Sequence, residues 1–124
     1  MTIIRATQAT HFELPNVKFS GLVSPKQGSK ENSLWKFALA PKAPGTKHRL
    51  TREELILVTS GTAKVEIGSK TQMVAAGDAI IIPPHTDFSI SNESDAKFEG
   101  VAVLPVGGQA VIAGEEPFTP PWAL

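Results

Sequence analysis

The chain has 124 residues, of which 41% are hydrophobic and 19% are charged, and its formal net charge at pH 7 is zero. This length and composition fit one folded domain with one hydrophobic core. The balanced charge argues against a nucleic-acid-binding protein and against attachment to an anionic membrane surface. The chain contains no cysteine, which excludes disulfides, thiolate metal sites and cysteine nucleophiles.

The N-terminal segment, residues 1–13, lacks the basic region, apolar stretch and cleavage site of a secretory signal. No apolar run approaches the roughly 18 residues that a membrane-spanning helix requires. We therefore expect a cytoplasmic protein. The ten glycines and ten prolines are typical of a chain built from short strands and turns rather than from helices.

Short apolar runs separated by turn residues predict strands along most of the chain. The first expected strand, 17–23, ends before a polar loop at 26–33, and the next, 34–40, places Trp35, Phe37 and Leu39 on one face. Alternation in 63–67 predicts a strand with one buried and one solvated face. Further strands are expected at 54–59, 72–75, 79–82, around Phe88 and Ile90, and at 98–104. Short strands at this spacing indicate a sandwich or a barrel.

The final segment, 114–124, contains three prolines together with a phenylalanine and a tryptophan. Its prolines exclude it from the centre of a sheet. Because it is too apolar to remain free in water, we expect it to lie across the barrel or across a partner subunit. The chain is thus expected to form one domain over 1–124, with a core barrel at about 34–105 and an extended proline-rich tail at 110–124.

The first of two motifs in the middle of the chain begins at His48. Leu50 follows after one residue, Glu54 after three more, and Gly61 after six more. On a strand, residues of the same parity point to the same face. The spacing from His48 to Leu50 and Glu54 therefore places all three side chains on one side of the chain.

The second motif begins at Gly77 and reaches Pro83 after five residues. His85, Phe88 and Asn92 follow at fixed intervals. The two motifs, in this order and joined by the short hairpin at 64–76, resemble the paired motifs of the cupin superfamily. The resemblance implies an all-β fold, the cupin double-stranded β-helix or jelly-roll barrel with antiparallel strands. It also implies a homodimer, because small cupins often pair through edge strands and exchanged terminal segments.

In the family pattern, His48 and Glu54 match metal ligands that point into the barrel. Leu50 and Phe88 stand where the pattern has two further histidine ligands, and neither can donate electrons to a metal. Two remaining ligands rarely hold a divalent ion without help. We therefore expect no metal cofactor. If Fe, Mn, Ni or Zn is bound, His48 and Glu54 are the expected ligands, and His85 is the candidate third.

Two other histidine interpretations bear on this prediction. His85 is expected to serve a turn rather than a metal, because histidine is among the residues enriched at positive φ. His11 is distant in sequence and joins the site only if a folded-back N-terminus or a partner chain brings it close. His48 and Glu54 themselves are interpreted as a hydrogen-bonded pair at the pocket mouth or, alternatively, as an acid–base unit in an apolar pocket.

The leading functional hypothesis is a cupin that binds a small organic molecule in its barrel, with His48 and Glu54 orienting a polar group. The expected pocket residues are His48, Leu50, Glu54, Phe88, Trp35 and Phe37. One alternative is a metal-dependent dioxygenase, isomerase or lyase acting on a small organic acid. Another is a non-catalytic regulatory or assembly module that acts through the surface and the C-terminal tail.

Overall fold

The computed structural model describes all residues from 1 to 124 and consists almost entirely of antiparallel strands. The strands are β1 (Thr10–Leu14), β2 (Val17–Val23), β3 (Asn32–Leu39), β4 (Arg49–Leu50), β5 (Glu54–Ser60), β6 (Thr62–Ile67), β7 (Lys70–Ala75), β8 (Ala79–Ile82), β9 (Phe88–Ser91), β10 (Phe98–Pro105) and β11 (Ala110–Val111). The three 3-10 helices are η1 (Ala6–Gln8), η2 (Pro25–Gln27) and η3 (Pro121–Ala123). None of the helices is long and apolar enough to cross a membrane.

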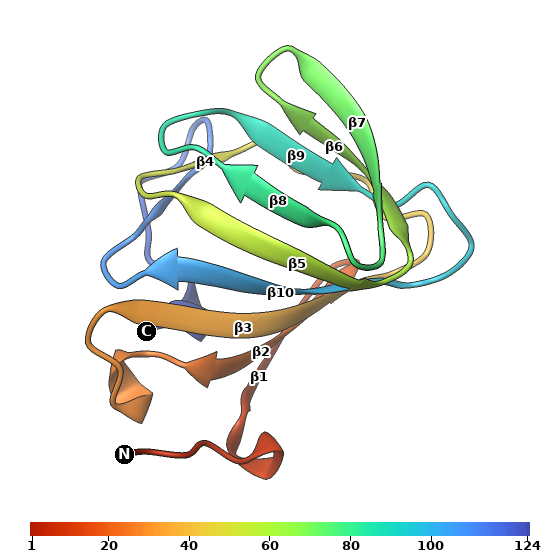
Figure 1. The fold of residues 1–124 in the computed structure, drawn as a ribbon. Helices are drawn as coiled ribbons and strands as arrows, with labels where there is room; N and C mark the ends of the chain where they lie inside the picture. The colour runs from red at the N-terminus through yellow and green to blue at the C-terminus, as the bar shows by residue number, and fades with distance from the viewer.

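Three sheets form the wall of the molecule. The largest has the strand order β1-β2-β3-β10-β5-β8, a second has the order β7-β6-β9, and β11 pairs with β4 in a third. Figure 1 shows the six-stranded sheet sweeping around one side while β6, β7 and β9 lie on the opposite side. The antiparallel all-β barrel expected from the sequence is confirmed.

Alternation along the strands fills the barrel with apolar side chains. On β3, Trp35 and Phe37 are buried while Lys36 between them is exposed. Phe98 and Leu104 on β10 are completely buried. Gly100, opposite Phe37 in the β3–β10 ladder, leaves space that the aromatic ring occupies, because a Cβ at this position would lie 2.7 Å from the ring. A close approach of this kind requires glycine.

The structure adds elements that hydrophobic patterning did not predict. β1 extends the large sheet beyond β2, and Phe12 pairs with Phe19 in that ladder. β3 begins at Asn32, two residues earlier than expected, and β7 begins at Lys70. The strand expected from residue 54 is present as β5, but the first motif is not one continuous strand: His48 precedes the two-residue strand β4, and residues 51–53 separate β4 from β5. His48 and Glu54 therefore do not share a strand.

The C-terminal tail lies across the barrel of its own chain. The ring of Trp122 stacks on Phe19, with centroids 3.6 Å apart and planes 7° from parallel, and it meets Phe12 and Trp35 edge to face. Such aromatic pairs contribute about 0.5–1.5 kcal/mol beyond the area they bury. The backbone of Phe118 also bridges to Ala110. The homodimer and the exchange of terminal segments stay predictions.

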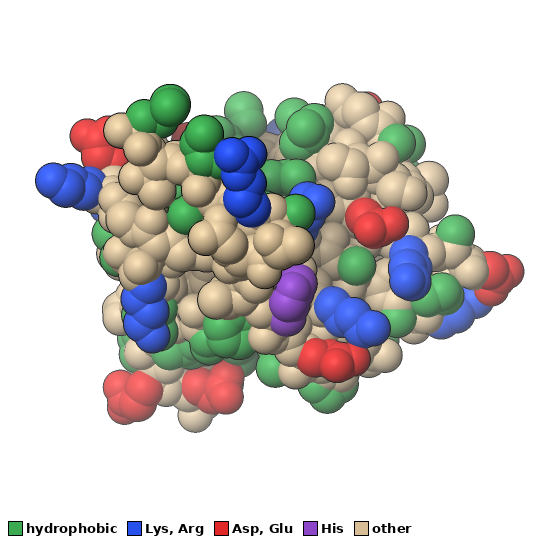
Figure 2. Space-filling view, turned by 90° about the horizontal axis from the view of Figure 1, so that it is seen from below, with side chains coloured by type: hydrophobic (Ala, Val, Ile, Leu, Met, Phe, Trp, Pro, Cys, Tyr) green, Lys and Arg blue, Asp and Glu red, His purple; other side chains and the backbone are tan.

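Surface charges of both signs are mixed. Figure 2 shows one face of the molecule, on which basic and acidic side chains are scattered and neither sign forms a continuous field. Some surface charges of the molecule pair with each other, as Lys64 does with Glu93 and Lys42 with Asp95. The prediction that nucleic acid is not a partner stays a prediction.

Candidate functional site

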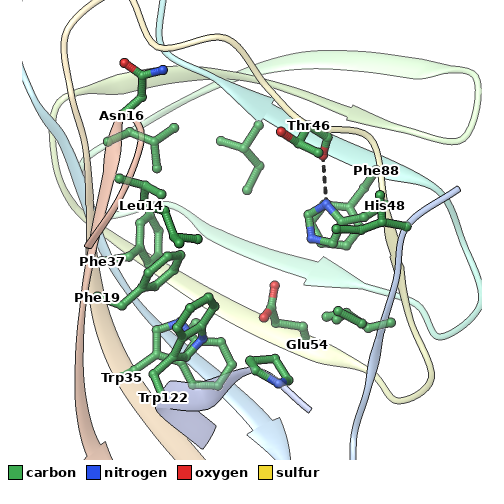
Figure 3. Close-up of a pocket in the computed structure, with 18 of the residues that line it drawn as sticks. Leu14, Asn16, Phe19, Trp35, Phe37, Thr46, His48, Glu54, Phe88 and Trp122 are labelled. Atoms are coloured by element: carbon green, nitrogen blue, oxygen red, sulfur yellow. Dashed lines mark hydrogen bonds between the residues drawn. The ribbon is translucent and has the colours of Figure 1, made fainter. Parts of the chain in front are cut away.

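A cavity of about 310 Å³ opens inside the barrel between the large sheet, β4, β9 and the C-terminal tail. Of its 23 lining residues, 16 are hydrophobic. Its two ionisable residues are His48 and Glu54, and Asn16 and Thr46 add further polar groups. Figure 3 shows aromatic side chains gathered on one side, with His48 and Phe88 on the other and Glu54 between them. A concave, mainly apolar site with few polar groups is typical of a small-molecule pocket.

The structure places every residue of the expected pocket at this cavity. These residues are His48, Leu50, Glu54, Phe88, Trp35 and Phe37. The C-terminal tail, which was expected to lie across the barrel or across a partner subunit, supplies Phe118 and Trp122 to the wall. Phe19 of β2 is a wall residue that sequence reasoning did not single out. Alternation in β2 was a signal for Phe19. No local pattern shows that Trp122 folds back onto it.

Backbone contacts fix His48 at the cavity. Its N–H donates to the carbonyl oxygen of Phe88 at 3.0 Å, and the Phe88 N–H donates in return at 2.8 Å. Beside this bridge, the Arg49 Nε donates to Asp87 Oδ1 at 2.8 Å, and this bond lowers the pKa of Asp87. β4 and β9 are thus held together at the point where the imidazole projects.

The imidazole of His48 is held in one tautomer. Its Nδ1 lies 2.8 Å from the carbonyl oxygen of Thr46, so Nδ1 carries the proton and donates it. Burial lowers the pKa of His48, although the Thr46 hydrogen bond and the charge of Asp87 oppose this effect. The ring is therefore neutral at physiological pH, and its Nε2 is a hydrogen-bond acceptor.

Two apolar side chains occupy the positions of the missing histidines. The Phe88 ring lies against the His48 imidazole, with centroids 4.2 Å apart and planes at 49°. Leu50, which is 3% exposed, pairs with Ala110 of the tail. The space beside the imidazole is thus filled by carbon atoms.

The carboxyl group of Glu54 is buried without a partner. The residue is 7% exposed, and it lines the cavity from the start of β5. No hydrogen bond or neighbouring charge compensates for its burial, and burial alone raises its pKa to about 8. At pH 7 this side chain is therefore mostly a neutral carboxylic acid.

The expected direct pairing of His48 with Glu54 is wrong. The imidazole donates to Thr46 instead, and the carboxyl forms neither a hydrogen bond nor an ion pair within the chain. The reason is that residues 51–53 separate β4 from β5, so that His48, which precedes β4, and Glu54, which begins β5, do not lie on one strand. Both side chains nevertheless point toward the same space in Figure 3.

The other two histidines lie away from this site. His85 has a φ of 57° and an exposed side chain, so the expected turn role is confirmed. His11 lies on the exposed face of β1, where Nδ1 is 3.1 Å from the Ser20 hydroxyl. No group of three or more His, Cys, Asp or Glu residues able to hold a metal is present. The donor set therefore does not fit a cupin metal centre, which needs more than one imidazole and one carboxylate.

Residues 35–104 match the family profile described as the cupin domain, which covers more than half of the chain. The chain therefore belongs to the cupin family. Cupins often bind transition metals, and the departures at Leu50 and Phe88 distinguish this chain from that pattern. No protein of curated function matches the sequence.

Solved structures support the same fold. The chain is similar to the polyketide cyclase RemF from Streptomyces resistomycificus, with 18% identity over 94% of this chain and 87% of that one and a TM-score of 0.79. A predicted oxalate decarboxylase from Thermotoga maritima is 20% identical over 85% and 99% of the two chains, with a TM-score of 0.72. An RmlC-like cupin from Shewanella frigidimarina is 17% identical over 83% and 88%, with a TM-score of 0.71. At these identities the likeness establishes the fold alone.

The raised pKa of Glu54 predicts a stability that falls with pH. Between its ordinary pKa of 4.5 and about 8, the unfolded chain has released this proton while the folded chain retains it. The free energy of unfolding should therefore decrease by about 1.4 kcal/mol per pH unit in this range from this group. Below and above the range, both states carry the same charge at this group and its contribution is constant.

Urea denaturation at about pH 5 and about pH 9 tests this effect. Glu54→Gln removes the ionisable group and should make the decrease of the free energy of unfolding between these two pH values smaller. Glu53→Gln, at the neighbouring exposed position, should retain the wild-type dependence. An unchanged pH dependence in Glu54→Gln would show that the carboxyl is paired or solvated.

The incomplete donor set predicts that the chain does not retain a transition metal. Protein purified without chelators, incubated with Mn, Fe, Ni or Zn and then desalted, should contain far less than one equivalent by plasma mass spectrometry. Near-stoichiometric metal that disappears in His48→Ala would contradict the prediction and restore the metal-enzyme hypothesis.

Proposed function

We propose that this cupin binds a small organic molecule with a mainly apolar body inside its barrel. The observation that carries the proposal is the cavity of about 310 Å³, in which hydrophobic residues surround two ionisable groups that do not bond each other. Apolar walls supply affinity through burial, and a few polar groups set the orientation of the ligand. The bound molecule would turn its polar end toward His48 and Glu54.

The shape of the cavity supports an aromatic or otherwise planar ligand. Phe19, Trp35 and Phe37 present ring surfaces to the interior, and Trp122 adds a further ring from the tail. Offset and edge-to-face contacts between rings add favourable energy to the burial of area. The neighbours named as a polyketide cyclase and a predicted oxalate decarboxylase share the fold and do not specify a ligand.

The structure favours binding over metal-dependent catalysis. Leu50 and Phe88 fill the positions at which a metal centre would need imidazoles, and no third donor replaces them. The proposal therefore assigns His48 and Glu54 to the ligand rather than to a cofactor.

Filling the cavity should abolish binding. Leu50→Trp inserts an indole at a residue that is 3% exposed and lines the cavity, whereas Arg52→Trp adds the same group at an exposed position two residues away. Calorimetric titration with 2-naphthol and 2-phenylethanol measures binding. We expect Leu50→Trp to raise the dissociation constant of each probe at least about tenfold, and Arg52→Trp to leave it unchanged.

Circular dichroism establishes that both variants retain the β fold. The proposal fails if folded wild-type protein binds no probe of this kind. It also fails if folded Leu50→Trp binds as tightly as the wild type does.

A further inference from the structure

His48 and Glu54, the two ionisable residues of the cavity, share one property: each has a hydrogen-bond acceptor for which the chain supplies no donor. The Nδ1 of His48 is committed to Thr46, so Nε2 is left as an acceptor. The Glu54 carboxyl makes no hydrogen bond or ion pair, although the residue is more than nine-tenths buried. A buried polar group without a partner is costly, and its presence at a cavity indicates that a bound molecule supplies the partner.

The charges around the cavity restrict what that molecule can be. No lysine or arginine lines the cavity, and its single acidic residue is Glu54. An anionic ligand would find no cation in the lining, and it would be repelled by the Glu54 carboxyl whenever that group is ionised. A ligand with an ammonium group would supply the missing counter-charge, and its N–H groups can donate to Glu54 and to Nε2 of His48.

The aromatic wall suits a cation for an independent reason. Phe19, Trp35 and Trp122 lie together on one side of the cavity, and the Glu54 carboxyl projects toward the space in front of them. The faces of aromatic rings attract organic cations, and tryptophan does so most strongly. The same rings can bury the apolar body of the molecule.

The indole nitrogen of Trp122 does not change this assignment. It is a buried donor without a hydrogen-bond partner, so it would suit a ligand with an acceptor. However, the indole is stacked on Phe19, and the nitrogen itself is closed off from solvent and from the cavity space. A ligand in the cavity therefore meets the accessible carboxyl and imidazole first.

We infer that the ligand class is an amphiphilic organic amine whose ammonium group pairs with Glu54 and whose apolar body lies against the aromatic wall. This inference rests on the proposed function, because it names the class of molecule that the same cavity binds. It goes beyond that function by assigning the polar end of the ligand a positive charge.

Three probes of similar size and different charge test the inference. They are 2-phenylethylamine, the neutral 2-phenylethanol and the anionic 3-phenylpropionate. Calorimetric titrations are run at about pH 8.5, where the alkylamine is protonated and the carboxyl is free to ionise. We expect the dissociation constant of 2-phenylethylamine to be at least about tenfold lower than that of 2-phenylethanol. We expect 3-phenylpropionate to bind most weakly of the three.

Substitutions test whether Glu54 causes the preference for the amine over the alcohol. Glu54→Gln keeps the size of the side chain and should bring the affinity ratio of amine to alcohol to about one. His48→Phe removes the second acceptor and should weaken the amine more than the alcohol. Glu53→Gln, at the exposed neighbouring position, should keep the wild-type ratio.

The outcomes separate this inference from the proposed function. If 2-phenylethanol binds as tightly as 2-phenylethylamine, or if the preference for the amine survives in Glu54→Gln, the amine assignment is wrong and the apolar binding cavity stands. If none of the three probes and no uncharged aromatic probe binds, both the inference and the proposed function are overturned.

Discussion

The burial of one carboxyl group without a counter-charge is the constraint on which the site depends. Glu54 begins β5, and its side chain, which is 7% exposed, lines an apolar cavity in which the chain supplies no cation. Ionisation in such surroundings is expensive, which is why its pKa rises to about 8. A carboxyl in this position lowers the free energy of unfolding at neutral pH, and we propose that its role is to contact a ligand.

The rest of the cavity is consistent with that constraint. The bridge between His48 and Phe88 and the ion pair of Arg49 with Asp87 hold β4 and β9 together, and the hydrogen bond from Nδ1 to the Thr46 carbonyl oxygen sets the tautomer of the imidazole. Phe88 fills the space beside the imidazole with a ring. Leu50 and Phe88, at the positions where the family pattern has histidines, line the same cavity with carbon atoms. One fold can hold such different chemistry because function resides in the side chains that line it.

Much of the barrel could be predicted from the sequence because the patterns that indicate strands are local. Alternation places Trp35 and Phe37 on the inner face of β3, and the motif spacing places His48 and Glu54 at the cavity. A strand was expected from residue 54, where β5 begins, but the pairing of β4 with β11 from the far end of the chain has no local signal. The contribution of Trp122 to the wall is equally non-local, since its stacking partner Phe19 lies over 100 residues away in sequence. The absence of a partner for Glu54 also becomes visible only when the surrounding side chains are placed in space.

The most direct test of this account is the titration of the Glu54 carboxyl carbon in labelled protein by carbon-13 nuclear magnetic resonance. The signal is assigned by its absence in Glu54→Gln. The account predicts a midpoint near 8, because no cation, metal or hydrogen bond stabilises the ionised form in the free protein. A midpoint near the ordinary value of 4.5 would show that the carboxylate is solvated or paired, and it would contradict the cavity described here.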